Sequence, residues 1–128
     1  MPLSSSAQAP SPLPTPRRGE IYLVRLDPTE GSEQAGTRPA VVVSRDAINR
    51  HSPVIVICPL TDAAHVPKLY PSDVRVKAPE GGLTKDSVVL TGQVRAIAKS
   101  RLLKRLGELR PKTLEQVEQA LKITLNLP

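Results

Sequence analysis

Apolar residues in this chain fall in short runs separated by polar segments, a pattern typical of strands joined by loops. Ile21–Leu26 mixes β-branched and aromatic residues and is predicted to be a strand. Ala40–Ser44 and Val54–Leu60 are almost continuously apolar, as expected of strands buried on both faces. Shorter runs predict three further strands, over Val74–Val76, Ser87–Leu90 and Val94–Ile97.

The polar segments between these runs contain turns and one long loop. Residues 27–37 (DPTEGSEQAGT) form a polar loop of 11 residues, a length at which loops are often functional. Glu80–Gly82 marks a turn, and Asp46 is placed to cap one helical turn over Ala47–Arg50. Ser100–Leu106 is predicted to be a short basic helix.

The C-terminal segment carries the clearest helical pattern. Thr113 is the expected N-cap, Gln116 occupies the capping-box position, and Pro111 lies just before the helix. One face is apolar at helical spacing, through Leu114, Val117, Ala120, Leu121 and Leu125. Short strands followed by a final helix predict a mainly β (α+β) fold, a small, strongly bent sheet or barrel with helices packed outside.

The composition predicts one ordinary domain with a basic surface. The 128 residues are 39% apolar and include no Phe or Trp, so Val, Leu, Ile and Ala must build the core. With so few aromatic side chains, domains that stack RNA bases on aromatic platforms are disfavoured. Lys and Arg number 18 against 12 Asp and Glu, and the net charge of +6 favours a polyanionic partner.

Residues 1–16 differ in composition from the rest of the chain. They hold five of the 14 prolines and several serines, and they have no charged side chain. This composition predicts a disordered tail, followed by a single domain over residues 17–128. No apolar run approaches about 20 residues, so no membrane span is expected and a cytoplasmic location is predicted.

Residues for conventional catalysis are few. Cys58, the single cysteine, lies within an apolar strand and is expected to be a buried, inert thiol. His51 and His65 lie in polar stretches, and surface positions are favoured because nothing in their spacing brings them together as an acid–base pair. Scattered carboxylates and scarce Cys and His predict no metal site, and no P-loop is present.

Two strand boundaries carry side chains suited to binding a phosphate. Pro39 restricts the backbone before its strand, so Arg38 can present a charged guanidinium from a rigid position. Thr61 follows the second apolar strand, where its hydroxyl can donate to a phosphoryl oxygen. Two alternatives stay open: a surface arginine paired with Glu30 or Glu33, and a threonine that caps a turn.

Basic residues concentrate near the C-terminus. Between Arg95 and Lys112 there are seven Lys and Arg but one acidic residue, Glu108. A solvated face explains such a cluster, and so does a track for a polyanion. The net positive charge of the chain favours the track.

Several motifs follow one another in a defined order over residues 17–126. They start with RGEIYLV at 18–24 and LDP at 26–28, followed by GSEQ at 31–34 and G-x-RPAVVV at 36–43. The order is completed by PLT at 59–61, SVVL at 87–90 and QVRAI at 93–97. Together these motifs closely resemble the MazF/PemK family, the toxins of bacterial toxin–antitoxin pairs.

The resemblance implies a compact SH3-like barrel of the MazF/CcdB toxin type, with a C-terminal helix, that forms a homodimer. It implies a metal-independent endoribonuclease, without a cofactor, that cleaves single-stranded RNA, mostly mRNA, at short sequences. It also implies a MazE-like antitoxin whose acidic C-terminal segment occupies the RNA groove. Contact with promoter DNA is expected only through the antitoxin complex.

The family's catalytic residues have counterparts here by position. Arg38 and Thr61 match its catalytic arginine and threonine, and Glu33 is a candidate for orienting Arg38 or accepting a proton. The expected reaction is attack of the RNA 2′-hydroxyl on the adjacent phosphorus. It leaves a 2′,3′-cyclic phosphate or 3′-phosphate and a 5′-hydroxyl, and the protein must orient the nucleophile and stabilise charge.

The resemblance also implies residues that bind RNA. Gln93 and Arg95 match the family's Gln-x-Arg element and are expected to contact nucleotides beside the cut. Ser32 and Gln34 are expected to contact the RNA backbone or base edges.

Two functions of other classes compete with the endoribonuclease. A gyrase-directed toxin of the CcdB type shares the fold, but such toxins end in Trp-Gly-Ile, whereas this chain ends in Asn126–Pro128 and has no Trp. The other is a non-catalytic SH3-like module that binds nucleic acid or a peptide. The presence of Arg38 and Thr61 argues against it.

Overall fold

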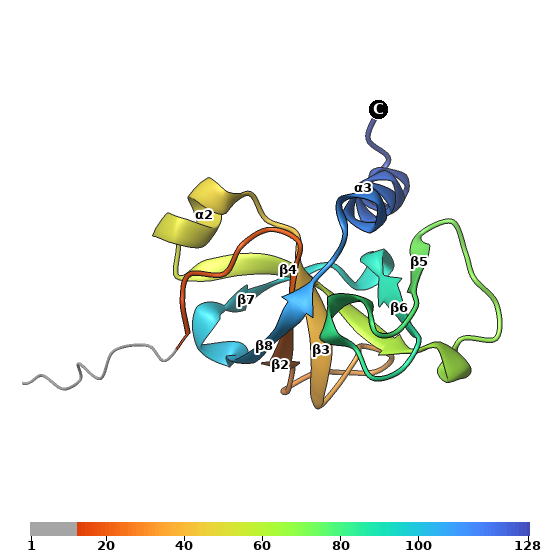
Figure 1. The fold of residues 1–128 in the computed structure, drawn as a ribbon, viewed down its shortest axis with the longest axis horizontal. Coiled ribbons are helices and arrows are strands. Elements are labelled where there is room, and N and C mark those ends of the chain that lie inside the picture. Colours follow the sequence, from red (N-terminus) through yellow and green to blue (C-terminus); the bar gives the residue numbers. More distant parts are fainter. Residues whose placement is uncertain (1–12) are drawn as a thin grey trace, which may run out of the picture.

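Seven antiparallel strands form one strongly bent sheet in the computed structural model, which describes residues 13–128 (Figure 1). The strands are β2 (Glu20–Arg25), β3 (Thr37–Val42), β4 (Val54–Asp62), β5 (Asp73–Val76), β6 (Ser87–Leu90), β7 (Arg95–Ala98) and β8 (Leu102–Glu108). Their order is β5-β6-β4-β3-β2-β8, and β7 also pairs with β4. The predicted mainly β fold with a C-terminal helix is therefore confirmed.

The long strand β4 makes the bend between the two parts of the sheet. Its first residues, 54–57, pair with β7, and its last three, 60–62, pair with β6. Pro59 lies between these stretches and has no amide hydrogen to donate, so the ladder passes from one partner to the other there. β4 also pairs with β3, which brings the ends of these two strands together.

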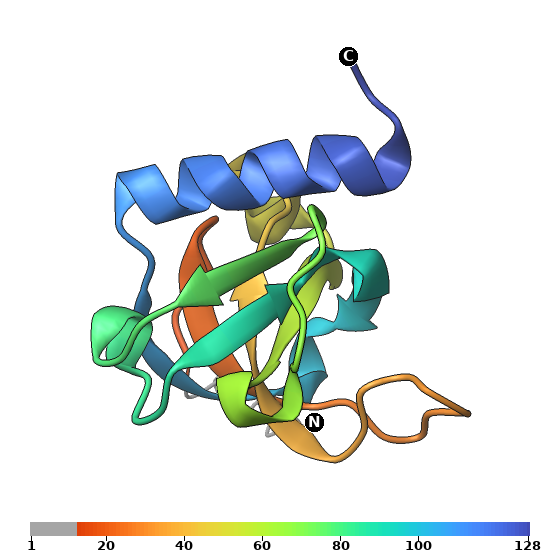
Figure 2. The ribbon, with the colours of Figure 1, turned by 90° about the vertical axis from the view of Figure 1, so that its right-hand side faces the viewer.

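Side chains that alternate along the strands pack into two apolar clusters. Val41 and Leu60 belong to the cluster beneath the C-terminal helix α3 (Pro111–Leu125), which buries Val117 and Ala120 against it. Figure 2 shows α3 lying across the strands. The second cluster includes Tyr22, Val24, Leu26, Ala40, Val42, Ile55 and Ile57. As predicted, the core has no Phe or Trp and consists mainly of aliphatic side chains.

Short helical segments connect the strands of the described chain. They are α2 (Asp46–His51) and the 3-10 turns η1 (Ala63–His65), η2 (Glu80–Gly82), η3 (Thr91–Gln93) and η4 (Lys99–Arg101). The predicted role of Asp46 as a helix cap is wrong, because α2 begins at Asp46 and its N-cap is Arg45. The carboxylate of Asp46 instead accepts a hydrogen bond from the backbone amide of Arg18 at 2.8 Å.

The C-terminal helix is confirmed, but its predicted start is wrong. The helix begins at Pro111, with Arg110 as N-cap, so Thr113 lies inside the first turn. Proline suits the first helical position because its missing amide hydrogen and restricted φ carry no cost there. Leu125 belongs to the predicted apolar face but is 52% exposed, because the helix extends past the core at its end.

The predicted basic helix over residues 100–106 is wrong. The chain forms the turn η4 and then β8, which pairs with β2 along the edge opposite β3. Pairing completes the hydrogen bonding of the buried strand β2, and this tertiary requirement overrides local helical preference. The predicted turn over residues 80–82 is confirmed and packs against β8. A Cβ at Gly82 would lie 1.9 Å from the carbonyl oxygen of Leu106, so this approach requires glycine.

The N-terminal segment approaches the sheet before β2. Residues 1–12 of the predicted tail lie outside the described residues. Leu13 packs against the second apolar cluster and Pro16 is buried, so described contacts begin four residues before the expected start of the domain. Among residues 13–128, no helix has the length and apolar character needed to cross a membrane.

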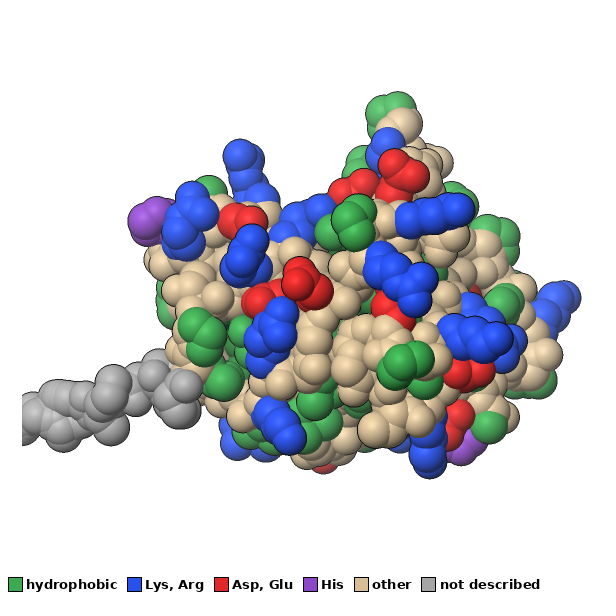
Figure 3. Space-filling model, in the orientation of Figure 1, with side chains coloured by type: hydrophobic (Ala, Val, Ile, Leu, Met, Phe, Trp, Pro, Cys, Tyr) green, Lys and Arg blue, Asp and Glu red, His purple; other side chains and the backbone are tan. Residues whose placement is uncertain are grey.

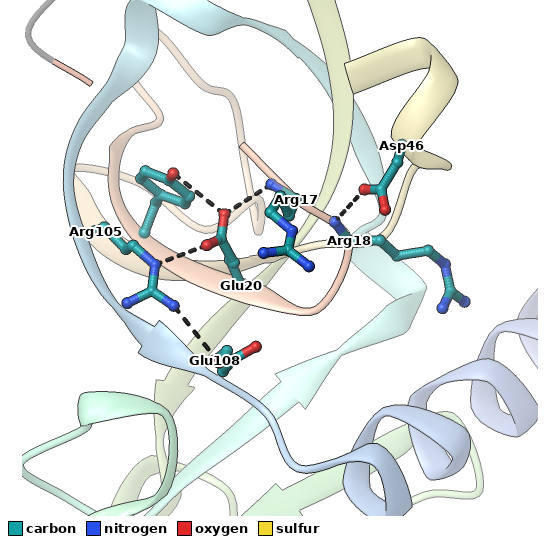
Figure 4. A network of polar contacts seen from close by, with 7 residues as sticks. Arg17, Arg18, Glu20, Asp46, Arg105 and Glu108 are labelled. Atoms are coloured by element: carbon teal, nitrogen blue, oxygen red, sulfur yellow. Dashed lines mark hydrogen bonds and ion pairs between the residues drawn. The ribbon is translucent and has the colours of Figure 1, made fainter. Parts of the chain in front are cut away.

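A buried carboxylate ties the start of β2 to β8 (Figure 4). Glu20 is 7% exposed, and its Oε2 accepts a hydrogen bond from Nε of Arg105 at 2.7 Å. Its Oε1 accepts from the amide of Arg17 at 2.7 Å and from the hydroxyl of Tyr22 at 3.3 Å. Arg105 also lies 3.8 Å from Glu108. The buried negative charge is thus fully compensated, which such a position requires.

Candidate active site

Arg38 and Thr61 meet at the adjoining ends of β3 and β4. The β3–β4 ladder ends where Ala40 pairs with Pro59, two residues from each of them. Both side chains line a cavity of about 430 Å³, which we call the Arg38 cavity. Its polar lining comprises Arg38, Thr61, Asp62, His65, Thr84, Lys85 and Ser87.

The two predicted catalytic groups are free to bind a ligand. Arg38 donates from Nε to the carbonyl oxygen of Ala35 at 3.0 Å, and within residues 13–128 its terminal nitrogens have no partner. Thr61 is 7% exposed, and its hydroxyl makes no hydrogen bond to any described residue. A guanidinium fork fixed at its base and a free hydroxyl can both donate to phosphoryl oxygens.

Arg38 lies inside a strand rather than at its boundary. β3 begins at Thr37, three residues before the predicted strand, because Thr37, Arg38 and Pro39 pair with β2. Pairing with Val24 of β2 holds the backbone of Arg38, which agrees with the predicted rigid mount. The alternative left open for Arg38 is not observed, because it makes no ion pair with Glu30 or Glu33 in the described chain.

The charged groups beside Thr61 are already engaged. Asp62 accepts a hydrogen bond from the amide of Ala64 at 2.9 Å and lies 3.6 Å from the ammonium of Lys85. The hydrogen bond from Ala64, together with the nearby positive charges of Lys85 and His65, lowers the pKa of Asp62. This carboxylate is therefore ionised and poorly suited to accept a proton near neutral pH.

The other five predicted site residues lie together in a second cavity of about 580 Å³. We call it the Gln93 cavity. It is bounded by the β2–β3 loop (residues 26–36) and by the segment joining η3 to β7. Its lining includes Ser32, Glu33, Gln34, Gln93 and Arg95.

Gln93 and Arg95 hold the β2–β3 loop in place. The Oε1 of Gln93 accepts from the amide of Gln34 at 2.7 Å, and its Nε2 donates to the carbonyl oxygen of Ser32 at 3.3 Å. Arg95 donates to the carbonyl oxygen of Leu26 at 3.3 Å. The Oε1 of Gln34 is buried and has no hydrogen-bond partner among the described residues, which leaves one acceptor free at the cavity.

Glu33 lies apart from Arg38. It lines the Gln93 cavity, and its Oε1 accepts a hydrogen bond from the amide of Glu30 at 2.8 Å. The structure therefore groups Glu33 with the loop residues and not with the Arg38–Thr61 pair. Its predicted role of orienting Arg38 stays a prediction.

His65, predicted to lie at the surface, is exposed and also lines the Arg38 cavity. It ends the turn η1, four residues after Thr61 and directly beyond the end of β4. This closeness in sequence to Thr61 was the available signal. His51 ends α2 and lines neither cavity, and Figure 3 shows the two histidine side chains on opposite sides of the molecule. Cys58 is buried as predicted, and burial raises its pKa to about 12.

The basic stretch between Arg95 and Lys112 is partly occupied by internal contacts. Arg95 and Arg101 donate to backbone oxygens, Arg105 pairs with Glu20, and Arg110 lies 3.9 Å from Glu80. The lysines of the stretch, Lys99, Lys104 and Lys112, form no ion pair within the described residues. Figure 3 shows basic side chains interspersed with acidic ones over one face. Only part of the stretch is therefore available to a polyanion.

Comparison with known families assigns the fold and the motifs to one group of proteins. Residues 17–125 match the family described as PemK-like, MazF-like toxin of type II toxin–antitoxin system. The chain belongs to this toxin family. The endoribonuclease MazF of Staphylococcus epidermidis is 39% identical over 111 residues, covering 87% of this chain and 92% of that protein. The endoribonuclease MazF of Staphylococcus saprophyticus is 38% identical over the same length.

Solved structures of the toxin family share this fold. MazF from Deinococcus radiodurans has a TM-score of 0.76 and 31% identity, covering 88% of this chain and 98% of that one. A mycobacterial endoribonuclease in complex with its cognate antitoxin has a TM-score of 0.73 and 29% identity, covering 88% and 97%. These similarities confirm the predicted family and its fold. In residues 13–128, no cluster of three or more His, Cys, Asp or Glu is suited to a metal ion.

Proposed function

We propose that this chain is a toxin endoribonuclease that cleaves single-stranded RNA, principally mRNA, at short specific sequences. The observation that carries the proposal is the pairing of Arg38 and Thr61 in one cavity, with free donors on both, in a chain of the PemK/MazF family. Relatives that are 38–39% identical over most of the chain are endoribonucleases.

The Arg38 cavity contains the groups needed when an RNA 2′-hydroxyl attacks its adjacent phosphorus. The RNA provides the nucleophile, so the protein has to align the 2′-oxygen with the phosphorus and stabilise the charge that develops. Arg38 binds the phosphoryl oxygens through its terminal nitrogens, and Thr61 donates its hydroxyl to one of them. The products are a 2′,3′-cyclic phosphate, or the 3′-phosphate from its hydrolysis, and a 5′-hydroxyl.

The Gln93 cavity accommodates the nucleotides beside the cut. The free Oε1 of Gln34 can accept a hydrogen bond from a base, and Ser32, Gln93 and Arg95 line the same space. Since Gln93 and Arg95 also hold the loop, they contribute to recognition by fixing its shape as well as by contact. Glu33 lines the same cavity and is the candidate group there for accepting a proton.

The partners follow from the family. Solved relatives form complexes with MazE or with a cognate antitoxin, and we propose a MazE-like antitoxin with an acidic C-terminal segment for this chain. The toxin acts as a homodimer and meets promoter DNA only through the antitoxin complex. Because the proposed substrate is mRNA, we place its action in the cytoplasm.

End-labelled single-stranded RNA, incubated with the protein in EDTA, tests the proposed function. We expect discrete fragments with 5′-hydroxyl ends and cyclic phosphate or 3′-phosphate ends, and cleavage about 10²–10³-fold slower by Arg38→Ala. Fragments that appear only after Mg²⁺ is added would contradict the mechanism. Binding without cleavage would favour the non-catalytic SH3-like module instead.

A further inference from the structure

His65 lies at the candidate active site because it closely follows Thr61 in the sequence. Thr61 and Asp62 end β4, and the turn η1 follows immediately, with His65 as its last residue. Asp62 caps this turn by accepting the amide hydrogen of Ala64, which fixes where the turn leaves the strand. His65 is exposed and lines the Arg38 cavity together with Arg38 and Thr61, so a bound phosphodiester can reach its imidazole.

The cavity otherwise lacks a group that exchanges protons near neutral pH. The guanidinium of Arg38 stays charged, since arginine is not deprotonated in proteins. Lys85 is paired with Asp62, whose pKa is lowered by the hydrogen bond from Ala64. Thr61, Thr84 and Ser87 carry neutral hydroxyls. Imidazole is the side chain that ordinarily changes charge between pH 5 and 8.

We propose that His65 is a catalytic residue, the general acid that protonates the departing 5′-oxygen of the RNA. The inference rests on the proposed function, because it concerns the same cavity and the same phosphodiester. Arg38 and Thr61 bind phosphoryl oxygens, and His65 adds a group that protonates the leaving oxygen.

Water accepts one proton in this step and later returns one to His65. The 2′-hydroxyl loses its proton to a water molecule as the bond from the 2′-oxygen to phosphorus forms. The bond from phosphorus to the 5′-oxygen breaks, and that oxygen takes a proton from the imidazolium of His65. The neutral imidazole then recovers a proton from the solvent. No metal ion, redox partner or covalent enzyme intermediate enters the step.

The charges around His65 come from three elements. Asp62 at the end of β4 attracts the imidazolium, and the same attraction contributes to the lowered pKa of this carboxylate. Lys85, ahead of β6, and Arg38 on β3 are positive and line the same cavity. Bound RNA adds negative phosphates to this set.

A substrate with a bridging 5′-sulfur in place of the 5′-oxygen at the cleaved bond separates this role from others. A thiolate leaves without protonation, so such RNA has no need of a general acid. Single-turnover cleavage of the oxygen and sulfur substrates is compared for wild type, His65→Gln and His51→Gln at saturating protein. His51→Gln is the matched control, since the chain has two histidines and His51 lines neither cavity.

We expect His65→Gln to lose about 100-fold in rate on the oxygen substrate, within the range of acid–base catalysis, and His51→Gln to match wild type. On the sulfur substrate the loss in His65→Gln is expected to disappear, whereas Thr61→Val remains slow on both. A wild-type rate for His65→Gln on the oxygen substrate would overturn the proposal. An equal loss on both substrates would also overturn it, because it indicates a positioning or base role.

The experiment distinguishes a failure of this inference from a failure of the proposed function. If wild-type protein cleaves neither RNA, the endoribonuclease itself is wrong. If wild type cleaves and His65→Gln cleaves equally well, only the role of His65 is wrong. His65 is exposed, so His65→Gln is expected to keep the melting temperature of wild type, and a melting curve confirms this before the rates are compared.

Discussion

The two cavities adjoin the same stretch of β4 but differ in how their polar groups are used. Pro59 lines the Gln93 cavity, whereas Leu60, Thr61 and Asp62 line the Arg38 cavity. In the Arg38 cavity the terminal nitrogens of Arg38 and the hydroxyl of Thr61 come from paired strands and have no protein partner in the described chain. In the Gln93 cavity the side chains of Gln93 and Arg95 already bind the backbone of a loop.

This difference separates chemistry from recognition. Groups that stabilise a transition state work best when a rigid scaffold holds them in place before the substrate arrives. A loop held by side-chain hydrogen bonds can change shape or composition without disturbing those groups. We therefore expect changes in the Arg38 cavity to lower the rate of the chemical step, and changes in the Gln93 cavity to weaken binding.

The largest effect is expected from the strand residues. Arg38→Ala and Thr61→Val each should lower the single-turnover cleavage rate by about 10²–10³-fold, the usual cost of removing one preorganised donor. Thr61→Val keeps the shape of the side chain and removes the hydroxyl. Circular dichroism and melting curves serve as controls for folding. A folded variant that cleaves at the wild-type rate would remove that residue from the mechanism.

Glu20 is expected to matter for stability and not for chemistry, because it lines neither cavity. Glu20→Ala leaves Arg105 and the amide of Arg17 without their acceptor and should lower the free energy of unfolding by about 2 kcal/mol. Urea unfolding measures this loss. The matched control is Glu108→Ala, which removes the distant, exposed partner of Arg105 and should change stability by less than about 0.5 kcal/mol.

We expect folded Glu20→Ala to cleave RNA at the wild-type rate below its melting temperature. That result would separate the stabilising role of Glu20 from the chemistry of the Arg38 cavity. A cleavage rate that falls as far as in Thr61→Val would contradict a purely structural role.

Gln93 is expected to have a smaller effect, on binding. Gln93→Ala frees the loop at Ser32 and Gln34 and should weaken RNA binding by about tenfold, roughly one lost hydrogen bond. Fluorescence anisotropy with uncleaved RNA on a Thr61→Val background measures the affinity. Gln116→Ala, on the exposed face of α3, is the matched control. Unchanged affinity in Gln93→Ala would show that the loop needs no such anchor.

The smallest effect at neutral pH concerns Tyr22, which is fully buried beside Glu20. Burial, together with the charge and hydrogen bond of Glu20, raises the pKa of Tyr22 to about 12 from an ordinary value of 10.0. Tyr22 ionises first in the unfolded chain, so its contribution to stability should be constant below pH 10 and fall as the pH rises from 10 towards 12. Urea unfolding across this range should show a shallower fall for Tyr22→Phe, and equal slopes would contradict the assignment.

Much of the fold follows from local pattern, and the failures have physical causes. Runs such as Ala40–Ser44 and Val54–Leu60 predict strands because both faces are buried. The segment that forms β8 mixes Leu with Lys and Arg and has no strand alternation, so its identity depends on pairing with β2. The start of α3 depends on a capping residue, Arg110, that has no side-chain cap.

The residues of the candidate site also differ in how far the sequence alone predicts them. Arg38 and Thr61 can be found from the order of motifs, and the fold brings both side chains to one cavity. The contacts of Gln93 join residues 59 and 61 positions apart, which no local pattern reveals. His65 lies in a polar turn where most histidines are merely exposed. Its place beside Arg38 follows from the fold, which brings residues of β3 and η1 to one cavity.

The central claim, that one cavity performs the chemistry and the other binds RNA, is tested by one measurement. The single-turnover cleavage rate is followed as a function of protein concentration for wild type, Thr61→Val and Gln93→Ala. We predict that Thr61→Val lowers the plateau rate at an unchanged half-saturating concentration, whereas Gln93→Ala raises that concentration and keeps most of the plateau. The reverse pattern, or plateau rates that fall equally in both variants, would contradict the division between the two cavities.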